Sequence, residues 1–332
     1  MILSLSLAGC FLLSFLLTRV FRLLALRFGV LDRPDSSVKI HKKATPYLGG
    51  PAFILSAFIV TLLYTALSPY TLPRQEWILF AGGGAMMITG AVDDIKKIRP
   101  GTKFLLQVMA AGGAVLLGIR LDIFFLPVWA NIALTLFWFV GVTNAFNLID
   151  IMDGLCGGIA AIGAFFLFFS NGDGNVFLLF LTASLAGFLM LNFPPARIFM
   201  GDSGSLALGF LLAGYSITGS FTVTNKLALI SPVLILWLPI YETILVSVLR
   251  IYKGRSPFYG SKDHFALRLK AAGFPHSAIL LLSYFLSIIM GESALIAVSL
   301  QAGDALLVYM LLFFVFTLFF YLLSKIDIDS LG

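Results

Sequence analysis

Charged residues are scarce in this sequence. Only 11% of the 332 residues are Asp, Glu, Lys or Arg, whereas 60% are hydrophobic. A soluble domain of this length cannot bury so large an apolar fraction in its core. The composition therefore excludes a soluble globular fold and predicts a protein that crosses a membrane several times.

Cysteine is almost absent, because the chain contains only two such residues. Cys10 and Cys156 both lie in apolar surroundings, so neither a disulfide framework nor a cysteine zinc site is expected. We also find no internal repeat, no low-complexity tract and no separate soluble domain. Residues 1–332 are therefore predicted to form a single integral-membrane domain.

Long apolar runs dominate what is present. A membrane helix needs about 20 apolar residues, and the sequence predicts an all-α protein with about eleven such helices. The expected spans lie near 2–21, 47–67, 77–92, 102–119, 123–143, 155–170, 176–191, 206–221, 227–249, 276–296 and 305–324. The first run lacks the basic start and the cleavage site of a signal peptide, so we keep it as a span.

The distribution of Lys and Arg predicts the orientation. If the N-terminus lies outside and the spans alternate, 19 of the 22 basic residues fall on or beside the cytoplasmic side. Only Arg74, Arg120 and Lys226 remain outside, as the positive-inside rule requires, and the C-terminus is cytoplasmic. Because the basic residues are spread over short loops, no nucleic-acid partner is expected.

Five polar clusters lie at the ends of apolar runs. They are Asp93-Asp94, Lys103, Asn144 to Gly154, Gly201 to Ser205, and Asp263-His264. On the alternating topology all five emerge on the cytoplasmic side. The loops near 22–46, 93–101, 144–154, 192–205 and 250–275 are therefore predicted to form one site at the membrane surface. Unrelated surface charges would have no reason to gather in this way.

Two of these clusters offer oxygen ligands. Asp93 and Asp94 suit a hard cation such as Mg²⁺, although a solvated acidic pair is the alternative. Asn144, Asn147, Asp150 and Asp153 recur every third residue, so consecutive members are neighbours on a helix face. The alternative for this second cluster is an Asn-rich turn that only caps helices.

The other clusters suggest anion contacts, each with a structural alternative. The small residues from Gly201 to Ser205 offer free N–H groups to an anion, or they simply start a helix. Lys103 could bind a diphosphate or reach the lipid headgroups. A single loop histidine such as His264 is more often inert than catalytic. Glu242 lies inside an apolar run, so we expect it to pair with another polar group.

Taken together, these segments resemble the polyprenyl-phosphate N-acetylhexosamine-1-phosphate transferases. That family includes the bacterial undecaprenyl-phosphate GlcNAc-1-phosphate transferases and the phospho-MurNAc-pentapeptide translocase. The matching motifs follow the same order from about residue 32 to 275. They are His41 to Gly50, Asp93-Asp94 with Lys103 and Gln107, Asn144 to Gly158, and Pro195 to Ser205.

The resemblance implies a reaction. A HexNAc 1-phosphate, with GlcNAc 1-phosphate as the first expectation, passes from a UDP-sugar to undecaprenyl phosphate, and UMP is released. The lipid-linked product would start a cell-envelope glycan at the inner membrane. UDP-MurNAc-pentapeptide and a modified UDP-HexNAc are alternative donors, and a homodimer is left open. A secondary transporter is the alternative from another class, but it would place its ionisable residues near the bilayer midplane.

The resemblance also implies a role for each motif residue. Asp93, Asn147 and Asp202 resemble ligands of Mg²⁺, with Mn²⁺ as an alternative ion. Asp94 resembles an acid that positions or deprotonates the lipid phosphate, and Lys103 resembles a diphosphate contact. Asp150 and Asp153 match family acids near the nucleotide, and the resemblance places them with Asp93, Asp94 and Lys103 among the catalytic residues. The residues matched to substrate binding are Phe199 on the uracil, Lys42 and Lys43 as basic contacts, and Asn144, Asn147, Asn192 and His264.

Two positions depart from the family pattern. His264 is the one histidine kept where relatives commonly have three, and Glu242 stands where relatives often have Asp. Because the histidine loop is associated with sugar and phosphate recognition, the identity of the amino sugar stays open.

Overall fold

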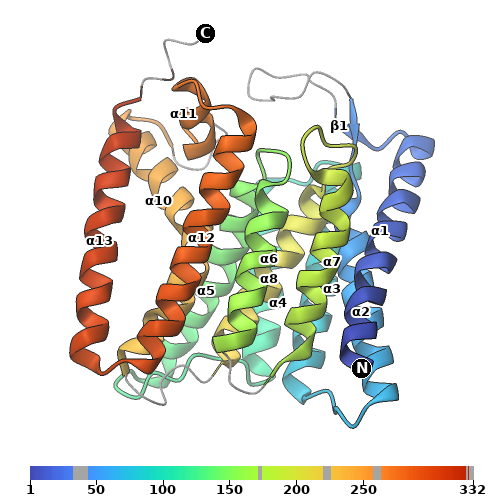
Figure 1. Cartoon of the computed structure of the whole chain (residues 1–332), viewed down its shortest axis with the longest axis horizontal. Helices are drawn as coiled ribbons and strands as arrows, with labels where there is room; N and C mark the ends of the chain where they lie inside the picture. The colour runs from blue at the N-terminus through green and yellow to red at the C-terminus, as the bar shows by residue number, and fades with distance from the viewer. Residues whose placement is uncertain (33–43, 171–173, 220–225, 257–262, 327, 329–332) are drawn as a thin grey trace.

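The structure is a computed structural model, and it forms a bundle of helices (Figure 1). It describes residues 1–32, 44–170, 174–219, 226–256, 263–326 and 328. The helices are α1 (Ile2–Phe28), α2 (Gly49–Leu67), α3 (Arg74–Ile95), α4 (Pro100–Leu116), α5 (Val128–Ile149), α6 (Leu155–Ser170), α7 (Val176–Asn192), α8 (Gly201–Thr218), η1 (Lys226–Ile230), α9 (Ser231–Ile235), α10 (Trp237–Tyr252), α11 (Phe265–Ala271), α12 (His276–Ser299) and α13 (Ala302–Ser324). Two short antiparallel strands, β1 (Leu31–Asp32) and β2 (Thr45–Pro46), complete the described residues.

Helices form at every predicted apolar run, and an all-α, multi-pass membrane protein is confirmed. Within the described ranges, six helices are long and apolar enough to span a membrane, namely α1, α2, α3, α5, α12 and α13, and a bent pair makes up to seven. Helices α4, α6 and α7 have 17, 16 and 17 residues. At 1.5 Å per residue they reach about 24–26 Å, less than the hydrocarbon thickness of about 30 Å. The number of eleven spans therefore stays a prediction.

The ninth apolar run is the one that does not form a single helix. A continuous helix was expected near 227–249, but the chain bends by 79° between Leu227–Ile235 and Trp237–Tyr252. Pro239 explains the break, because it has no N–H to donate to the carbonyl of Ile235 and its ring would clash with that carbonyl. The helix therefore ends and starts again around Leu236.

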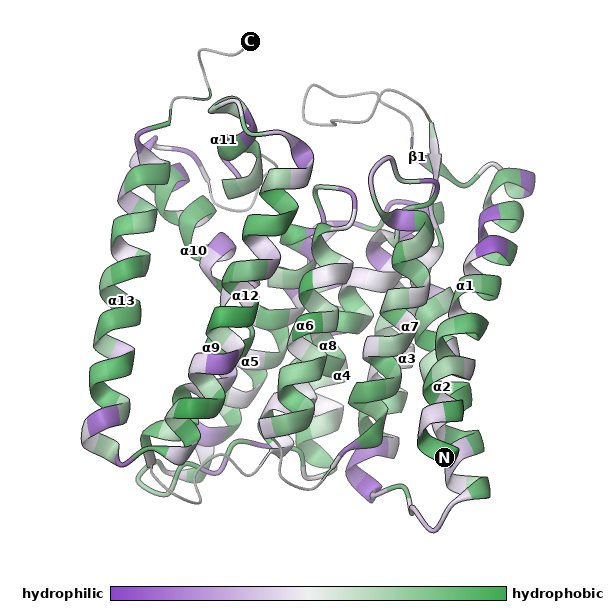
Figure 2. Cartoon of the chain, in the orientation of Figure 1, coloured by the Kyte–Doolittle hydropathy of each residue, from purple (hydrophilic) through white to green (hydrophobic). Residues whose placement is uncertain are grey.

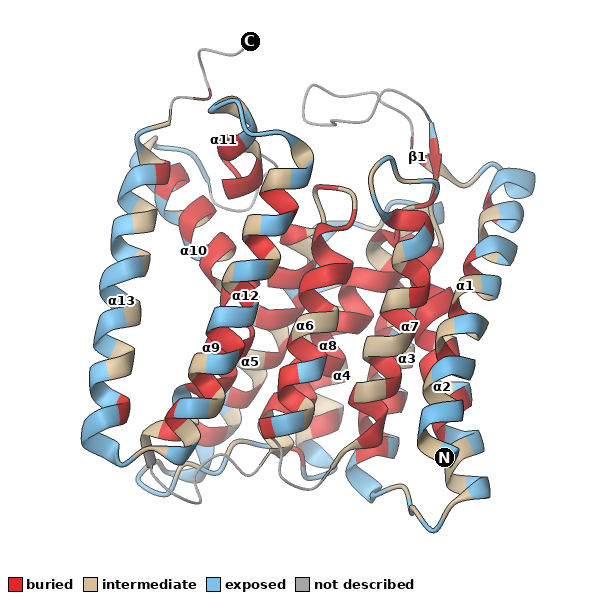
Figure 3. Cartoon of the chain, in the orientation of Figure 1, coloured by how far each residue is buried: buried red, intermediate tan, exposed pale blue. Residues whose placement is uncertain are grey.

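Helix α8 lies at the centre of the bundle, and 15 of its 18 residues are buried. Its neighbours approach closely because they present glycine. A side chain at Gly90 of α3 would overlap the backbone of Asp202, and one at Gly50 of α2 would overlap the backbone of Gly204. Figure 3 shows buried residues on the inner helices, whereas α1 and α13 are largely exposed. The helices are hydrophobic along most of their length (Figure 2).

One end of the bundle carries the polar clusters. The segment around β1 and α11 lies at this end, whereas α1 starts at the other end (Figure 1). The polar residues lie on the helix ends themselves, and the loops predicted near 93–101, 144–154 and 192–205 are shorter in the structure. Asp93 and Asp94 belong to α3, Asn144 and Asn147 belong to α5, and residues 201–205 form the first turn of α8. Which compartment this end faces stays a prediction.

Candidate active site

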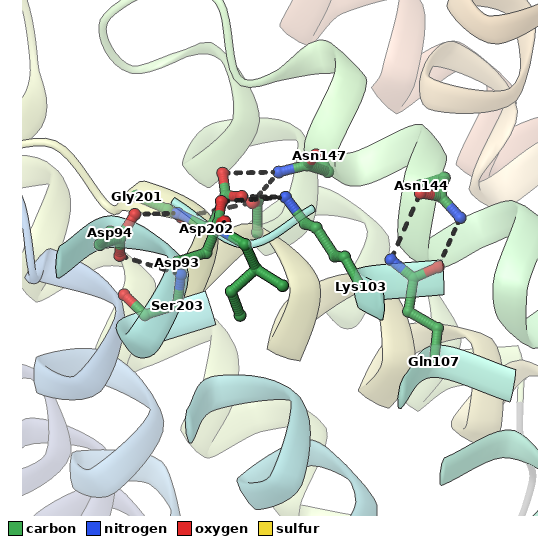
Figure 4. Close-up of polar contacts among 11 residues, drawn as sticks. Asp93, Asp94, Lys103, Gln107, Asn144, Asn147, Gly201, Asp202 and Ser203 are labelled. Atoms are coloured by element: carbon green, nitrogen blue, oxygen red, sulfur yellow. Dashed lines mark hydrogen bonds and ion pairs between the residues drawn. The ribbon is translucent and has the colours of Figure 1, made fainter. Parts of the chain in front are cut away.

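Four helices bring one charged cluster together (Figure 4). Asp93 ends α3, Lys103 lies in the first turn of α4, Asn147 lies in the last turn of α5, and Asp202 starts α8. The Lys103 ammonium forms a salt bridge with the Asp202 carboxylate and lies 3.4 Å from Oδ2 of Asp93. Asn147 Nδ2 donates to Asp202 Oδ1 at 2.9 Å. The predicted convergence of these residues is therefore seen in the structure.

Further hydrogen bonds hold the cluster, and most of its side-chain surface is buried. Oδ1 of Asp93 accepts the Ile98 N–H at 2.5 Å, and Asn147 Nδ2 also donates to Ser205 Oγ at 2.9 Å. The side chains of Asp93 and Lys103 are only 8% and 17% exposed. Charges in such surroundings interact more strongly than they do in bulk water. Two carboxylates and one ammonium leave a net negative charge here, which favours the binding of a further cation.

Asp94 points away from Lys103 and caps α8. Its Oδ1 accepts the Asp202 N–H at 2.8 Å, and its Oδ2 accepts the Ser203 N–H at 3.2 Å. A carboxylate is stabilised at a helix N-terminus, where the backbone N–H groups have no partner in the helix. Gly201 permits this contact, since its φ is +69° and a side chain there would overlap the Asp94 carboxylate. Asp94 thereby sets the position of Asp202, and its predicted contact with a lipid phosphate stays a prediction.

The turn from Asp150 to Gly154 connects α5 to α6 and is fastened to the chain that precedes α8. Asp153 Oδ2 accepts the Ala196 N–H at 2.9 Å. Asn192 Oδ1 accepts the Gly154 N–H at 3.0 Å, and its Nδ2 donates to the Ile198 carbonyl at 2.9 Å. Asp153 and Asn192 therefore have a structural role here, which the sequence did not predict. Their predicted substrate contacts stay predictions.

Asp150 differs from the other acids of the cluster. It is half-buried, and no described side chain or backbone N–H donates a hydrogen bond to its carboxylate. Burial raises the pKa of Asp150 well above its ordinary value, and the nearby carboxylates of Asp202, Asp94 and Asp153 raise it further. Asp150 is thus an acid of this cluster that no hydrogen bond from the described residues holds in place.

Asn144 lies beside the charged cluster, on the same helix as Asn147 (Figure 4). It forms a reciprocal amide pair with Gln107 of α4: Asn144 Nδ2 donates to Gln107 Oε1 at 2.7 Å, and Gln107 Nε2 donates to Asn144 Oδ1 at 3.3 Å. This pair joins α4 to α5 close to Lys103. Asn144 itself is exposed, so it remains accessible for its predicted substrate contact.

The remaining predicted residues lie around this end. Phe199 is half-buried, and its ring centroid is 6.2 Å from that of Tyr47. His264 Nδ1 lies 2.7 Å from Oε1 of the fully buried Glu242, whose Oε2 accepts the Phe265 N–H at 3.1 Å. The expected polar partner of Glu242 is therefore confirmed. Lys42 and Lys43 lie outside the described residues.

Comparison with known proteins identifies the family. The profile of glycosyl transferase family 4 matches residues 77–220. A Bacillus subtilis (strain 168) protein named as a probable undecaprenyl-phosphate N-acetylglucosaminyl 1-phosphate transferase is 32% identical over 95% of this chain and 89% of its own length. The chain belongs to glycosyl transferase family 4. The resemblance found in the motifs is thereby confirmed.

Two further relatives extend the comparison. A decaprenyl-phosphate N-acetylglucosaminephosphotransferase of Mycolicibacterium smegmatis is 31% identical over 79% of this chain and 74% of its own length. A phospho-N-acetylmuramoyl-pentapeptide-transferase of Moorella thermoacetica is 33% identical over 80% of this chain and 87% of its own length. The family profile runs from the first turn of α3 to the end of α8, a range that contains Asp93, Lys103, Asn147 and Asp202.

The donor atoms of the cluster fit a hard divalent cation. Asp93 and Asp202 supply carboxylate oxygens, and Asn147 supplies an amide, which are the ligand types that Mg²⁺ takes in proteins. Among the described residues, no three His, Cys, Asp or Glu side chains are grouped so as to hold a metal by themselves. The reason is visible in the site, because the third nearby acid, Asp94, is turned toward the start of α8.

Two residues near the site carry no sequence motif, and both belong to α12. Tyr284 Oη donates to the Gly154 carbonyl at 2.6 Å, and His276 Nε2 lies 3.2 Å from the Asp153 carbonyl oxygen. They are separated from their partners by 130 and 123 positions. No local pattern marks them, because only the packing of α12 on α6 brings them to this turn.

Proposed function

We propose that this chain transfers a HexNAc 1-phosphate, with GlcNAc 1-phosphate as the preferred group, from a UDP-sugar to undecaprenyl phosphate. The observation that carries the proposal is the Asp93, Lys103, Asn147 and Asp202 cluster at one end of a membrane bundle. The printed names of the Bacillus and Mycolicibacterium relatives support GlcNAc 1-phosphate, whereas the Moorella relative supports the pentapeptide donor as the alternative. The reaction is assigned to the cytoplasmic face of the inner membrane.

Asp93, Asp202 and the amide of Asn147 would hold Mg²⁺, with Mn²⁺ as the alternative ion. Such an ion, when bound, neutralises negative charge on the phosphates of the donor. Lys103 supplies a second positive charge at the same place and is suited to contact the diphosphate. Asp94 contributes by fixing the start of α8, and hence the carboxylate of Asp202.

The bond changes place modest demands on the protein. An oxygen of the lipid phosphate forms a bond to the β-phosphorus of the UDP-sugar, the bond between the α- and β-phosphates breaks, and UMP leaves. The attacking phosphate is largely ionised at neutral pH because its second pKa is about 6, so no strong base is required. Catalysis then depends on alignment and charge neutralisation, which the Asp93 to Asp202 cluster is suited to provide.

The location of the cluster suits substrates from two phases. The nucleotide sugar comes from water, and the prenyl chain of the acceptor stays in the bilayer. A site at the ends of apolar helices is open to both, whereas a site at mid-membrane would be closed to the nucleotide. The turn at Asp150 is positioned to meet the nucleotide, and undecaprenyl phosphate reaches the cluster from the lipid side.

Release of UMP by the purified full-length protein tests this proposal. The assay contains undecaprenyl phosphate, Mg²⁺ and one donor from a panel of UDP-GlcNAc, UDP-GalNAc and UDP-MurNAc-pentapeptide. Asp202→Asn is expected to lower turnover at least 100-fold, the usual effect of removing one electrostatic contact from a site of this type. Asp304→Asn is the matched control, because Asp304 also lies in the first turn of a helix, α13, but at the opposite end of the bundle.

The outcomes separate clearly. UMP release that requires both lipid and Mg²⁺ supports the reaction, and the donor with the highest kcat/KM identifies the sugar. Wild-type turnover in Asp202→Asn would overturn the assignment of the cluster. No UMP release from any donor on the panel would overturn the proposed function itself.

A further inference from the structure

The turn from Asp150 to Gly154 is held from two sides. On one side, Asn192 and Asp153 bind it to the segment before α8. On the other side, α12 contacts two successive carbonyls of the turn, through His276 at Asp153 and Tyr284 at Gly154. The carbonyl of Gly154 also accepts the Gly158 N–H at 3.0 Å, so it receives two donors at the start of α6.

Tyr284 packs into a gap that exists because residue 158 is a glycine. A side chain at Gly158 would overlap the hydroxyl and the ring of Tyr284, so residue 158 must lack one for the contact to form. This explains why glycine is needed at position 158 without invoking a ligand. A phenol fitted into a glycine gap, with its hydroxyl on a carbonyl at 2.6 Å, restrains both the position and the orientation of the turn.

The restraint on the turn determines the position of Asp150. Its carboxylate has no hydrogen-bond partner among the described residues, so no side-chain hydrogen bond fixes where it points and its position follows that of the turn. Gly154 ends this turn with a φ of +77°. Glycine adopts this conformation readily but also adopts others, so Gly154 alone does not fix the turn. Contacts from outside the turn are therefore needed to keep Asp150 in one place.

We propose that Tyr284 and His276 are positioning residues, which fix the Asp150–Gly154 turn for binding of the UDP-sugar. The inference rests on the proposed function. Both residues lie outside the range of 77–220 that the family profile matches. α12 thereby contributes to the donor site without touching the reacting atoms.

The consequence is a selective loss of donor binding when the contact is removed. Tyr284→Phe keeps the ring in the Gly158 gap and removes only the hydroxyl, and the Gly154 carbonyl retains the Gly158 N–H. The fold should therefore persist while the turn samples other positions. Because apparent affinity falls with the fraction of competent molecules, we expect KM for the UDP-sugar to rise about three- to tenfold.

The matched control is Tyr309→Phe. Tyr309 of α13 also donates its hydroxyl to a backbone carbonyl, that of Leu227, at 3.1 Å, but this contact belongs to the η1 segment and not to the turn. Gly158→Ala is a second variant, whose methyl group displaces the Tyr284 ring and hydroxyl from the space beside residue 158. Each protein is assayed for UMP release with the UDP-sugar and undecaprenyl phosphate varied in turn. Hydrogen exchange of peptides covering residues 150–158 is measured without substrate.

The expected result is a higher KM for the UDP-sugar in Tyr284→Phe, with KM for undecaprenyl phosphate within twofold of wild type. Faster exchange at 150–158 should accompany it, and Tyr309→Phe should show neither change. If Tyr284→Phe matches Tyr309→Phe in both the donor KM and the exchange rate, the inference is wrong. A wild-type protein without UMP release would instead refute the proposed function. In that event exchange at 150–158 alone tests whether α12 restrains the turn.

Discussion

Replacing Lys103 by methionine tests whether the cluster demands a cation. Methionine has a similar length but no charge, so Asp93 and Asp202 would lose the ammonium between them. Two carboxylates would then remain close together in a shielded place. We expect the variant to fold, to be less stable than wild type without divalent ions, and to recover stability when Mg²⁺ is added.

The size of the effect follows from the geometry. At 3.4 Å and an effective dielectric constant of about 20, one pair of charges interacts by roughly 5 kcal/mol before the cost of dehydration. Removing one partner of a buried pair costs about 3–5 kcal/mol. Because the Asp202 side chain is 25% exposed, we take the lower end, about 3 kcal/mol. For a protein of this size that loss lowers Tm by roughly 4 °C.

The assay is thermal unfolding of the purified protein in detergent, in EDTA and in a series of Mg²⁺ concentrations. Mg²⁺ should raise Tm more in Lys103→Met than in wild type, because the lysine no longer competes for the same carboxylates. Lys253→Met is the control. Its partner Asp263 lies 3.0 Å away and keeps a second cation, Arg268, at 2.8 Å, so its Tm should fall less and should not respond to Mg²⁺.

Two results would refute this reasoning. A Tm of Lys103→Met within 1 °C of wild type in EDTA would mean that the ammonium does not neutralise the pair, since about 3 kcal/mol predicts several degrees. An equal Mg²⁺ response in Lys103→Met and wild type would mean that Asp93 and Asp202 do not share a bound ion.

Two further substitutions test the surroundings of the cluster. Asp150 has a raised pKa, so the folded protein retains a proton that the unfolded chain releases, and this group makes stability fall as pH rises from about 4. Asp150→Asn should therefore raise Tm at pH 8 relative to wild type. Thermal scans should show that the difference in Tm between the variant and wild type becomes smaller toward pH 4. A difference in Tm that does not change with pH would contradict the burial of Asp150. Gly201→Ala should be less stable than Gly29→Ala by about 1–3 kcal/mol and should lose most UMP release. Both glycines have φ near +70°, but only Gly201 faces a carboxylate, that of Asp94. Equal Tm values for the two variants would argue against that contact.

The sequence predicts the helices and the main cluster because their signals are local. Apolar runs of about 20 residues mark helices wherever they occur. Asp93, Lys103, Asn147 and Asp202 stand at the ends of such runs, so the alternation of spans is enough to bring them to one side. Pro239 indicates the break in the ninth run. The hydropathy pattern does not show this break, because a hydropathy window averages over many residues and a single proline hardly changes it.

The roles within the site depend on contacts that no local pattern encodes. Asp94 and Asp93 are neighbours in sequence and chemically identical, yet one caps α8 and the other meets Lys103. Which does which depends on how α3 packs against α8. Asn192 was similarly expected to meet substrate, but its amide joins two backbone segments. Tyr284 needed knowledge of a contact 130 residues away.

The enclosure of α8 keeps the helix that carries Asp202 away from the perimeter of the bundle. Helices α1 and α13 face outward, and only two residues of α13 are buried, whereas α8 is covered by other helices on nearly every side. A thinner or thicker bilayer can be accommodated by tilting the peripheral helices, at a modest cost per ångström. The geometry around Asp202 should therefore tolerate changes in membrane thickness, while the outer helices absorb the adjustment.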